Sequence, residues 1–119
     1  MNERKPLFGY YLSDLARSSA LTNRVRKAEL RVGDTVFVRT SNSLYRIQLG
    51  KDGKFLVSGG WFSRYSAAPV AMTITGCTWG GSAILVDAVA AVGQRIEFAN
   101  RVVTSPVSSF FVIPREILN

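Results

Sequence analysis

Histidine is missing from this 119-residue chain, and cysteine occurs only once. Without histidine, the chain lacks the side chain that most often serves as a general base or activates a serine or cysteine nucleophile. The single cysteine, Cys77, cannot form an intramolecular disulfide, and such sparse cysteine usage suits a reducing compartment. The sequence therefore predicts a non-catalytic protein without a disulfide framework.

Acidic residues are also scarce, because eight Asp and Glu stand against 15 Lys and Arg, for a formal net charge of +7. The acids are scattered and show no spacing typical of metal ligands, so we predict neither a metal site nor a cofactor. A basic balance favours attraction to polyanions and carries no information about the fold. Residues 1–31 hold seven basic and three acidic residues, and residues 32–119 hold eight and five.

Long apolar runs are absent as well. The longest, Ala83–Gly93, is interrupted by Asp87 and is too short to cross a bilayer. The first residues, Met1–Pro6, lack the apolar core and the cleavage site of a secretory signal. We therefore expect a cytoplasmic protein with no membrane partner.

Strand-forming residues are abundant: the chain is 47% hydrophobic and 11% aromatic. Alternating apolar and polar residues predict a β-hairpin of Asp34–Arg39 and Leu44–Leu49 around a polar link. Gly50–Gly53 then predicts a tight turn into Lys54–Ser58. The residues predicted to face the core are Val36, Val38, Tyr45, Ile47, Leu49, Phe55, Val57, Ile96 and Phe98.

Further strands are predicted downstream, and Ala83–Val92 fits either a strand buried on both faces or a short helix. The whole pattern predicts an all-β domain over residues 32–119: a small, partly open antiparallel β-barrel of seven or eight short strands. The other segments with strand character are Val70–Thr75, Gln94–Ala99, Arg101–Thr104 and Ser109–Ile113.

Residues 1–31 form a basic N-terminal segment with weaker structural signals. Ser13 and Asp14 could cap a short helix. Arg24–Arg31 could form an edge strand or an extended arm, and its charges suit an edge because they discourage pairing with other molecules.

Four short motifs follow one another in a recognisable order. Gly33-Asp34 precedes T-x-N-S-x-Y at Thr40–Tyr45, followed by G-G-S at Gly80–Ser82 and T-S-P-V-x-S at Thr104–Ser109. Over residues 32 to 113, this order resembles a family of small, uncharacterised bacterial all-β proteins. The resemblance implies a small all-β domain and brings with it no known activity or cofactor.

Hydroxyl and amide side chains gather in two of these motifs, at the ends of predicted strands. Such groups often satisfy only the backbone of a turn. If the strand ends converge, the same groups would line a polar pocket, since binding sites favour loops on a rigid scaffold. The candidate binding residues, with nearby aromatic and basic side chains included, are Thr40, Asn42, Ser43, Tyr45, Trp61, Arg64, Trp79, Ser82, Thr104 and Ser105.

Two further residues and one loop are candidate sites. Cys77 has no activating group nearby in sequence and is interpreted as a small buried residue. Asp87 is an outward-facing strand residue, a buried acid paired with an arginine, or a functional acid. Gly76–Ser82 lacks the lysine of a phosphate-binding loop, so it predicts a bulge or corner that lets Trp79 fold over the barrel end.

Apolar residues on the face opposite the core suggest that the protein binds copies of itself or a protein partner. A chain of this length cannot bury two full apolar faces by itself, so we expect a binding or assembly module that forms a homo-oligomer or docks a protein partner. The outward apolar residues are Phe37, Leu44, Leu56, Leu85 and Phe111.

Single-stranded nucleic-acid binding is the alternative function. Small barrels bind single strands through a basic groove and aromatic rings on which bases stack. The basic arm would contribute to the attraction. The outward or loop positions that would contribute are Arg39, Arg46, Lys54, Arg64 and Arg95, with Phe37, Trp61, Phe62 and Tyr65 as stacking rings.

Overall fold

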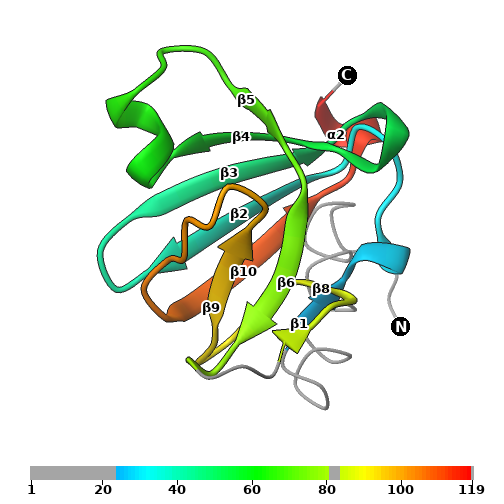
Figure 1. Cartoon of the computed structure of the whole chain (residues 1–119). Coiled ribbons are helices and arrows are strands. Elements are labelled where there is room, and N and C mark those ends of the chain that lie inside the picture. Colours follow the sequence, from blue (N-terminus) through cyan, green and yellow to red (C-terminus); the bar gives the residue numbers. More distant parts are fainter. Residues whose placement is uncertain (1–23, 81–83, 119) are drawn as a thin grey trace.

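The computed structural model describes residues 24–80 and 84–118 (Figure 1). Within these residues, ten strands form three sheets, and the strands paired in each sheet run antiparallel. The all-β prediction is confirmed. The helical elements there are short: η1 (Lys27–Glu29), η2 (Lys51–Gly53), η3 (Gly60–Arg64) and α2 (Arg115–Leu118). The predicted helix at Ser13 and Asp14 lies outside the described residues.

The largest sheet is a meander closed at one edge by the last strand. Its hairpin is the predicted one, with Val36 opposite Ile47 and Val38 opposite Tyr45. The turn that follows contains Asp52 at φ 62° and Gly53 at φ 73°, the left-handed backbone that the glycine predicts. In spatial order, the strands are β10 (Val107–Ile113), β2 (Thr35–Thr40), β3 (Leu44–Leu49), β4 (Phe55–Gly59) and β5 (Val70–Met72).

The two smaller sheets take up the middle of the chain. Strand β6 (Ile74–Thr78) lies between β7 (Ile84–Leu85) and β9 (Arg95–Phe98), and β1 (Arg24–Arg26) pairs with β8 (Ala88–Ala91). The edge-strand interpretation of Arg24–Arg31 is thus confirmed for its first three residues. A register shift between Ile74 and Gly76 places a β-bulge directly before the Gly76–Ser82 segment, for which a bulge or corner was predicted.

The hydrophobic core lies between the five-stranded sheet and strands β6 and β9, which cross in front of it in Figure 1. Val36, Ile47 and Val57 from the first layer and Ile74 and Phe98 from the second are fully buried. All the residues predicted to face the core are buried except Leu49, which is half-buried and packs against it.

Three local predictions are wrong. The run Ala83–Val92 does not form one strand or a helix, because residues 86 and 87 make a turn between β7 and β8. Val70–Thr75 is not one strand, because it divides at Thr73 into β5 and β6, and β6 continues to Thr78. Arg101–Thr104 is a loop with one isolated bridge, because Arg101 adopts φ 73° and turns the chain away from β9. Because the runs Val70–Thr75 and Ala83–Val92 each divide into two strands, and β1 is added, the number of strands exceeds the expected seven or eight.

The described strands remain in three separate sheets and do not close into one barrel. Across the described ranges, no helix has both the length and the apolar character needed to cross a membrane.

Candidate functional site

A groove of about 220 Å3 lies where three loops meet at one end of the five-stranded sheet. These loops are the β2–β3 turn, η3 and the segment between β9 and β10, which lie at the same end of the molecule in Figure 1. Seven of the ten candidate residues line the groove. Its full lining is Asn42, Ser43, Tyr45, Gly60, Trp61, Arg64, Val102, Val103, Thr104 and Ser105.

Thr40 shapes the β2–β3 turn from beside the groove. Its buried hydroxyl oxygen accepts hydrogen bonds from the backbone N–H groups of Asn42, at 3.3 Å, and Ser43, at 3.0 Å. This is the turn-satisfying role expected of a threonine between two strands. Thr40 therefore holds Asn42 and Ser43 in place without lining the groove.

The T-x-N-S-x-Y and T-S-P-V-x-S motifs meet, although Asn42 and Ser105 are 63 positions apart in the sequence. The hydroxyl oxygen of Ser105 accepts a hydrogen bond from the Asn42 backbone at 3.3 Å, and the Ser41 backbone donates to the Pro106 carbonyl at 3.1 Å. Thr104 is buried, and its hydroxyl accepts from the Ile96 backbone at 3.0 Å and donates to the Ser105 carbonyl at 2.7 Å. The bonds of Asn42 and Ser41 join the two sides of the groove, and those of Thr104 fix the loop that forms one side.

Trp61 takes its position from two glycines and a buried tyrosine. Gly59 and Gly60 have φ of 92° and 49°, and a side chain at Gly60 would overlap the Tyr45 ring. The Tyr45 hydroxyl accepts a hydrogen bond from the Trp61 backbone at 3.4 Å. The Trp61 ring lies 5.2 Å from the buried Phe62 ring, nearly perpendicular to it. The groove wall is thus anchored in the core.

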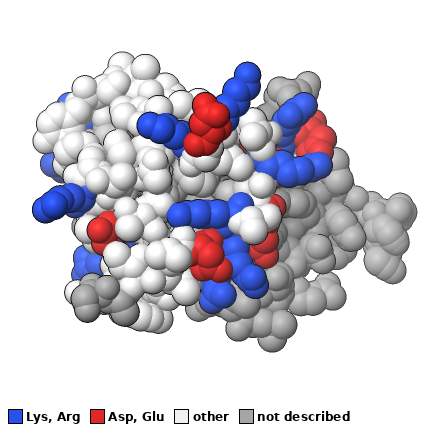
Figure 2. Space-filling view, turned by 45° about the vertical axis from the view of Figure 1, so that its right-hand side comes forward, with Lys and Arg blue, Asp and Glu red and all other residues white. Residues whose placement is uncertain are grey.

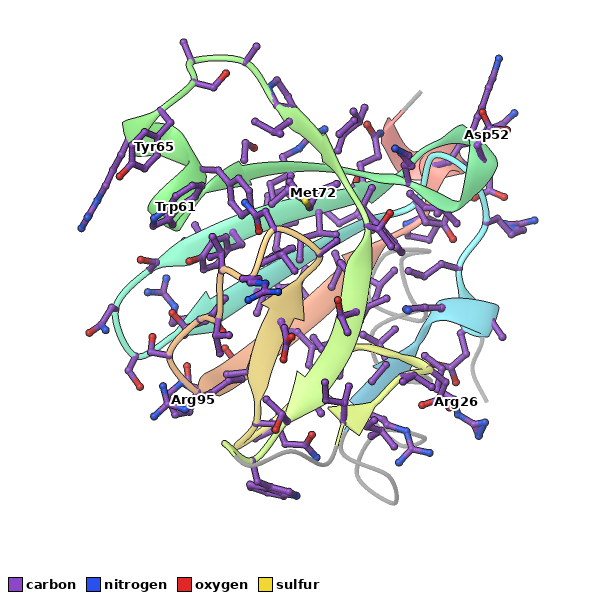
Figure 3. The ribbon with its side chains drawn as sticks, viewed as in Figure 1. Arg26, Asp52, Trp61, Tyr65, Met72 and Arg95 are labelled. Carbon is purple, nitrogen blue, oxygen red and sulfur yellow. The ribbon has the colours of Figure 1, made fainter. Side chains whose placement is uncertain are left out.

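Trp61 also forms an exposed aromatic pair with Tyr65 (Figure 3). The two ring centroids are 4.4 Å apart, and the side chains are 36% and 68% exposed. Tyr65 belongs to the segment that leaves η3 and was predicted as a stacking ring. Its neighbour in sequence, the exposed Arg64, lines the groove beside this pair.

Three polar side chains of the groove remain available to a ligand. Within the described ranges, no residue makes a hydrogen bond or ion pair with the Asn42 amide, the Ser43 hydroxyl or the Arg64 guanidinium. Val102 and Val103 add an apolar wall, and Val103 is 46% exposed. The groove therefore offers aromatic surface, an amide, a hydroxyl and a cation.

The three segments that form this end are basic. Residues 39–46, 59–69 and 99–109 contain four arginines and no Asp or Glu. Acidic residues lie elsewhere: Asp34 accepts from the backbones of Arg31 and Arg115 at 2.9 Å each, and Glu116 pairs with Arg31 at 2.5 Å. Figure 2 shows acidic and basic side chains side by side on the face it brings forward.

Two predicted site residues, Trp79 and Phe62, do not take part as expected. Trp79 is 73% exposed at the end of β6, near Gly93, and does not line the groove. Ser82 lies outside the described residues. Phe62 cannot stack on a base because it is 2% exposed and packs against Phe98 at 4.9 Å.

Sequence reasoning missed Gly60, Val102 and Val103 as groove residues. For Gly60, the available signal was a pair of glycines, Gly59 and Gly60, directly before an aromatic residue. The two valines were hidden because alternation assigned them to a strand that the structure does not contain.

The outer face of the five-stranded sheet carries a second hollow, of about 280 Å3. Phe37 and Phe111 stack there with centroids 5.3 Å apart, and Leu44 is 49% exposed beside them. Leu56, on the same face, is 37% exposed. Leu85 was also expected on an outward face, but it packs against the core, so that prediction is wrong.

Neither Cys77 nor Asp87 has surroundings typical of a catalytic residue. Cys77 is fully buried, as predicted, and burial raises the pKa of its thiol to about 12. Asp87 lies in the turn after β7, with Oδ2 3.9 Å from Nε of Arg26, so it is paired with an arginine as interpreted, but it is half-exposed rather than buried and lies outside the strands. The described residues hold no group of three His, Cys, Asp or Glu that could bind a metal ion.

The resemblance to the small bacterial family remains a prediction. Comparison of the chain with protein-family models, with curated proteins and with solved structures finds no match.

Proposed function

We propose that this protein is a non-catalytic assembly module that associates with a second copy of itself through the outer face of its five-stranded sheet. The observation that carries the proposal is the stacked pair of Phe37 and Phe111 beside Leu44, on the face directed away from the core. Exposed aromatic and leucine side chains on one regular surface gain free energy when a partner removes them from water.

The size of this face implies a weak, concentration-dependent dimer. Strands β10, β2, β3 and β4 are five to seven residues long and about 4.8 Å apart, so they cover roughly 400 Å2 in projection. A stable interface buries about 800 Å2 on each partner, so this patch supports reversible association rather than an obligate dimer. A two-fold arrangement is the simplest, because it matches the same patch on both copies.

A partly open barrel is the arrangement we infer behind this face. Only Thr73 separates β5 from β6, so the chain passes directly from the five-stranded sheet into the three-stranded one. Such a corner joins two layers around one core and leaves the outer face of the larger sheet to solvent.

The chemistry of the chain supports a non-catalytic role. The Cys77 thiol is buried and protonated, so it is not available as a nucleophile. We also infer a cytoplasmic location, which the single unpaired cysteine supports.

Sedimentation velocity tests the proposal over a hundredfold range of protein concentration. We expect the mean sedimentation coefficient of the native chain to rise with concentration. The double variant Leu44→Ser, Leu56→Ser should remain monomeric, because both side chains lie on the proposed interface and their exposure makes the change tolerable to the fold. Val86→Ser, which removes a valine that is 63% exposed outside this sheet, should associate like the native chain. A native chain that stays monomeric throughout would refute self-association.

A further inference from the structure

We propose that the groove binds one nucleotide of a single-stranded nucleic acid, with the base against Trp61 and Tyr65 and a phosphate at Arg64. This site is separate from the apolar sheet face, since the two hollows share no lining residue. The inference therefore does not depend on self-association.

The aromatic pair provides the stacking surface. Tyr65 is 68% exposed, and Trp61 is 36% exposed and braced by the buried Phe62 ring. A ring fixed by the core loses little conformational freedom on binding, so stacking against a base is not opposed by a large ordering cost. Every base has an aromatic face, so such a platform accepts single strands with little sequence preference.

Polar groups beside the rings suit the edge of a base and its backbone. The Asn42 amide offers donors and an acceptor, and the Ser43 hydroxyl offers both. Their backbones are already fixed by the Thr40 hydroxyl. Because these two side chains make no hydrogen bond within the described residues, a ligand can bind them without breaking an internal contact.

The charge around the groove favours an anion over a neutral ligand. Arg64 lines it, and Arg95 reaches the same loop, with Nη1 donating to the Thr104 carbonyl at 3.4 Å. Figure 3 shows Arg95 well apart from Trp61 and Tyr65. Cations spread along one end of the molecule match a chain of phosphates better than a single phosphate. For this reason we assign a strand rather than a free nucleotide.

The two tryptophans of the chain allow a site-specific test. Trp79→Phe leaves Trp61 as the only tryptophan, and its fluorescence should be quenched when a deoxythymidine 12-mer is added to the full-length protein. Trp61→Phe leaves only Trp79, whose fluorescence should not change. Quenching of Trp79 alone, or of neither residue, would overturn the proposal.

A matched pair of charge variants tests the phosphate contact by anisotropy of the labelled 12-mer. Arg64→Gln should weaken binding and reduce the slope of log K against log salt by about 0.7, the value for one phosphate contact in a single strand. Lys51→Gln removes the same charge from η2, at the opposite end of β4, and should leave the slope unchanged. Equal effects of both variants would show general attraction to the basic protein and refute a site.

A third variant and a third ligand complete the test. Tyr65→Ser should weaken binding of the 12-mer by about tenfold, the order of one lost stacking contact. Thymidine monophosphate should bind at least tenfold more weakly than the 12-mer. Equal affinity for the monophosphate would overturn the assignment of a strand, and native affinity of Tyr65→Ser would overturn the stacking platform.

Discussion

Cys77 shows how burial alone determines the chemistry of one residue. Cys77 lies on β6, its side chain is fully buried, and its Sγ is 4.0 Å from the Ala88 carbonyl oxygen. Burial raises the pKa from 9.0 to about 12, while the Ala91 backbone and Lys27 oppose the shift. A thiol that remains protonated reacts slowly with electrophiles, so its reactivity reports the opening of the fold.

The raised pKa of Cys77 predicts a dependence of stability on pH. Because the folded pKa of about 12 exceeds the unfolded value of 9.0, the contribution is complete below pH 9 and is lost as the pH rises toward 12. By pH 11 the native chain should lose about 3 kcal/mol more free energy of unfolding than Cys77→Ala. Urea denaturation at pH 8 to 11 measures this difference.

The comparison with Cys77→Ala is necessary because lysine and tyrosine titrate in the same range. These groups are common to both chains, so their contributions cancel. Parallel pH profiles for the native chain and the variant would contradict the buried-thiol interpretation.

The hydroxyls of the two motifs show what a sequence can and cannot indicate about a site. All three were predicted to lie at strand ends: Thr40 ends β2 and Ser43 directly precedes β3, whereas Thr104 lies in the loop between β9 and β10. The sequence could not distinguish their roles, because the Thr40 and Thr104 hydroxyls bind backbone groups, whereas Ser43 lines the groove and its hydroxyl bonds to no described residue. That difference depends on which backbone groups the fold brings within reach.

Among the elements, strands with one polar face were predicted best. In β2, β3 and β9, alternation reports directly which residues face the core. The run from Ala83 to Val92 gave no such signal, because β8 is buried on both faces and carries no polar residues to set its register. The loop after β9 was misassigned because Val102 and Val103 have strand propensity, whereas the turn at Arg101 directs the chain toward the groove.

The turn from β4 into η3 sets the groove wall, and Gly60 is its critical residue. Gly60→Ala would place a methyl group into the Tyr45 ring at φ 49°. We expect a loss of stability of about 3 kcal/mol or more, combining the left-handed backbone cost of roughly 1–2 kcal/mol with the overlap. A change in Trp61 emission in the Trp79→Phe background should accompany it, as the indole shifts with Tyr45.

Gly53→Ala is the matched control for this prediction. Gly53 also has a positive φ, of 73°, but a methyl group there would meet no atom within 4 Å. Gly53→Ala should lower the free energy of unfolding only by the cost of a left-handed backbone at alanine, about 1–2 kcal/mol. Equal destabilisation by the two variants in thermal denaturation would show that contact with Tyr45 does not position η3.

At the scale of the whole molecule, charge is distributed unevenly among the described residues. Arg26 and Arg31 pair with Asp87 and Glu116. The loops around the groove carry arginines without acidic neighbours in sequence. The outer sheet face likewise holds Arg39 and Arg46, and no Asp or Glu occurs in the strands β10, β2, β3 and β4 that form it. Both proposed surfaces are therefore basic, although their partners differ in charge.

This shared basic character predicts opposite responses to salt. Two copies of the sheet face bring Arg39 and Arg46 toward a like-charged surface, so screening should strengthen self-association several-fold between 50 and 500 mM NaCl. The groove releases counterions from a strand, so phosphate contacts at Arg64 and Arg95 should weaken oligonucleotide binding by about 25-fold over the same tenfold range. Sedimentation and anisotropy measured on one preparation provide both slopes. If self-association weakens as salt rises, ion pairs rather than the Phe37 and Phe111 surface hold the copies together.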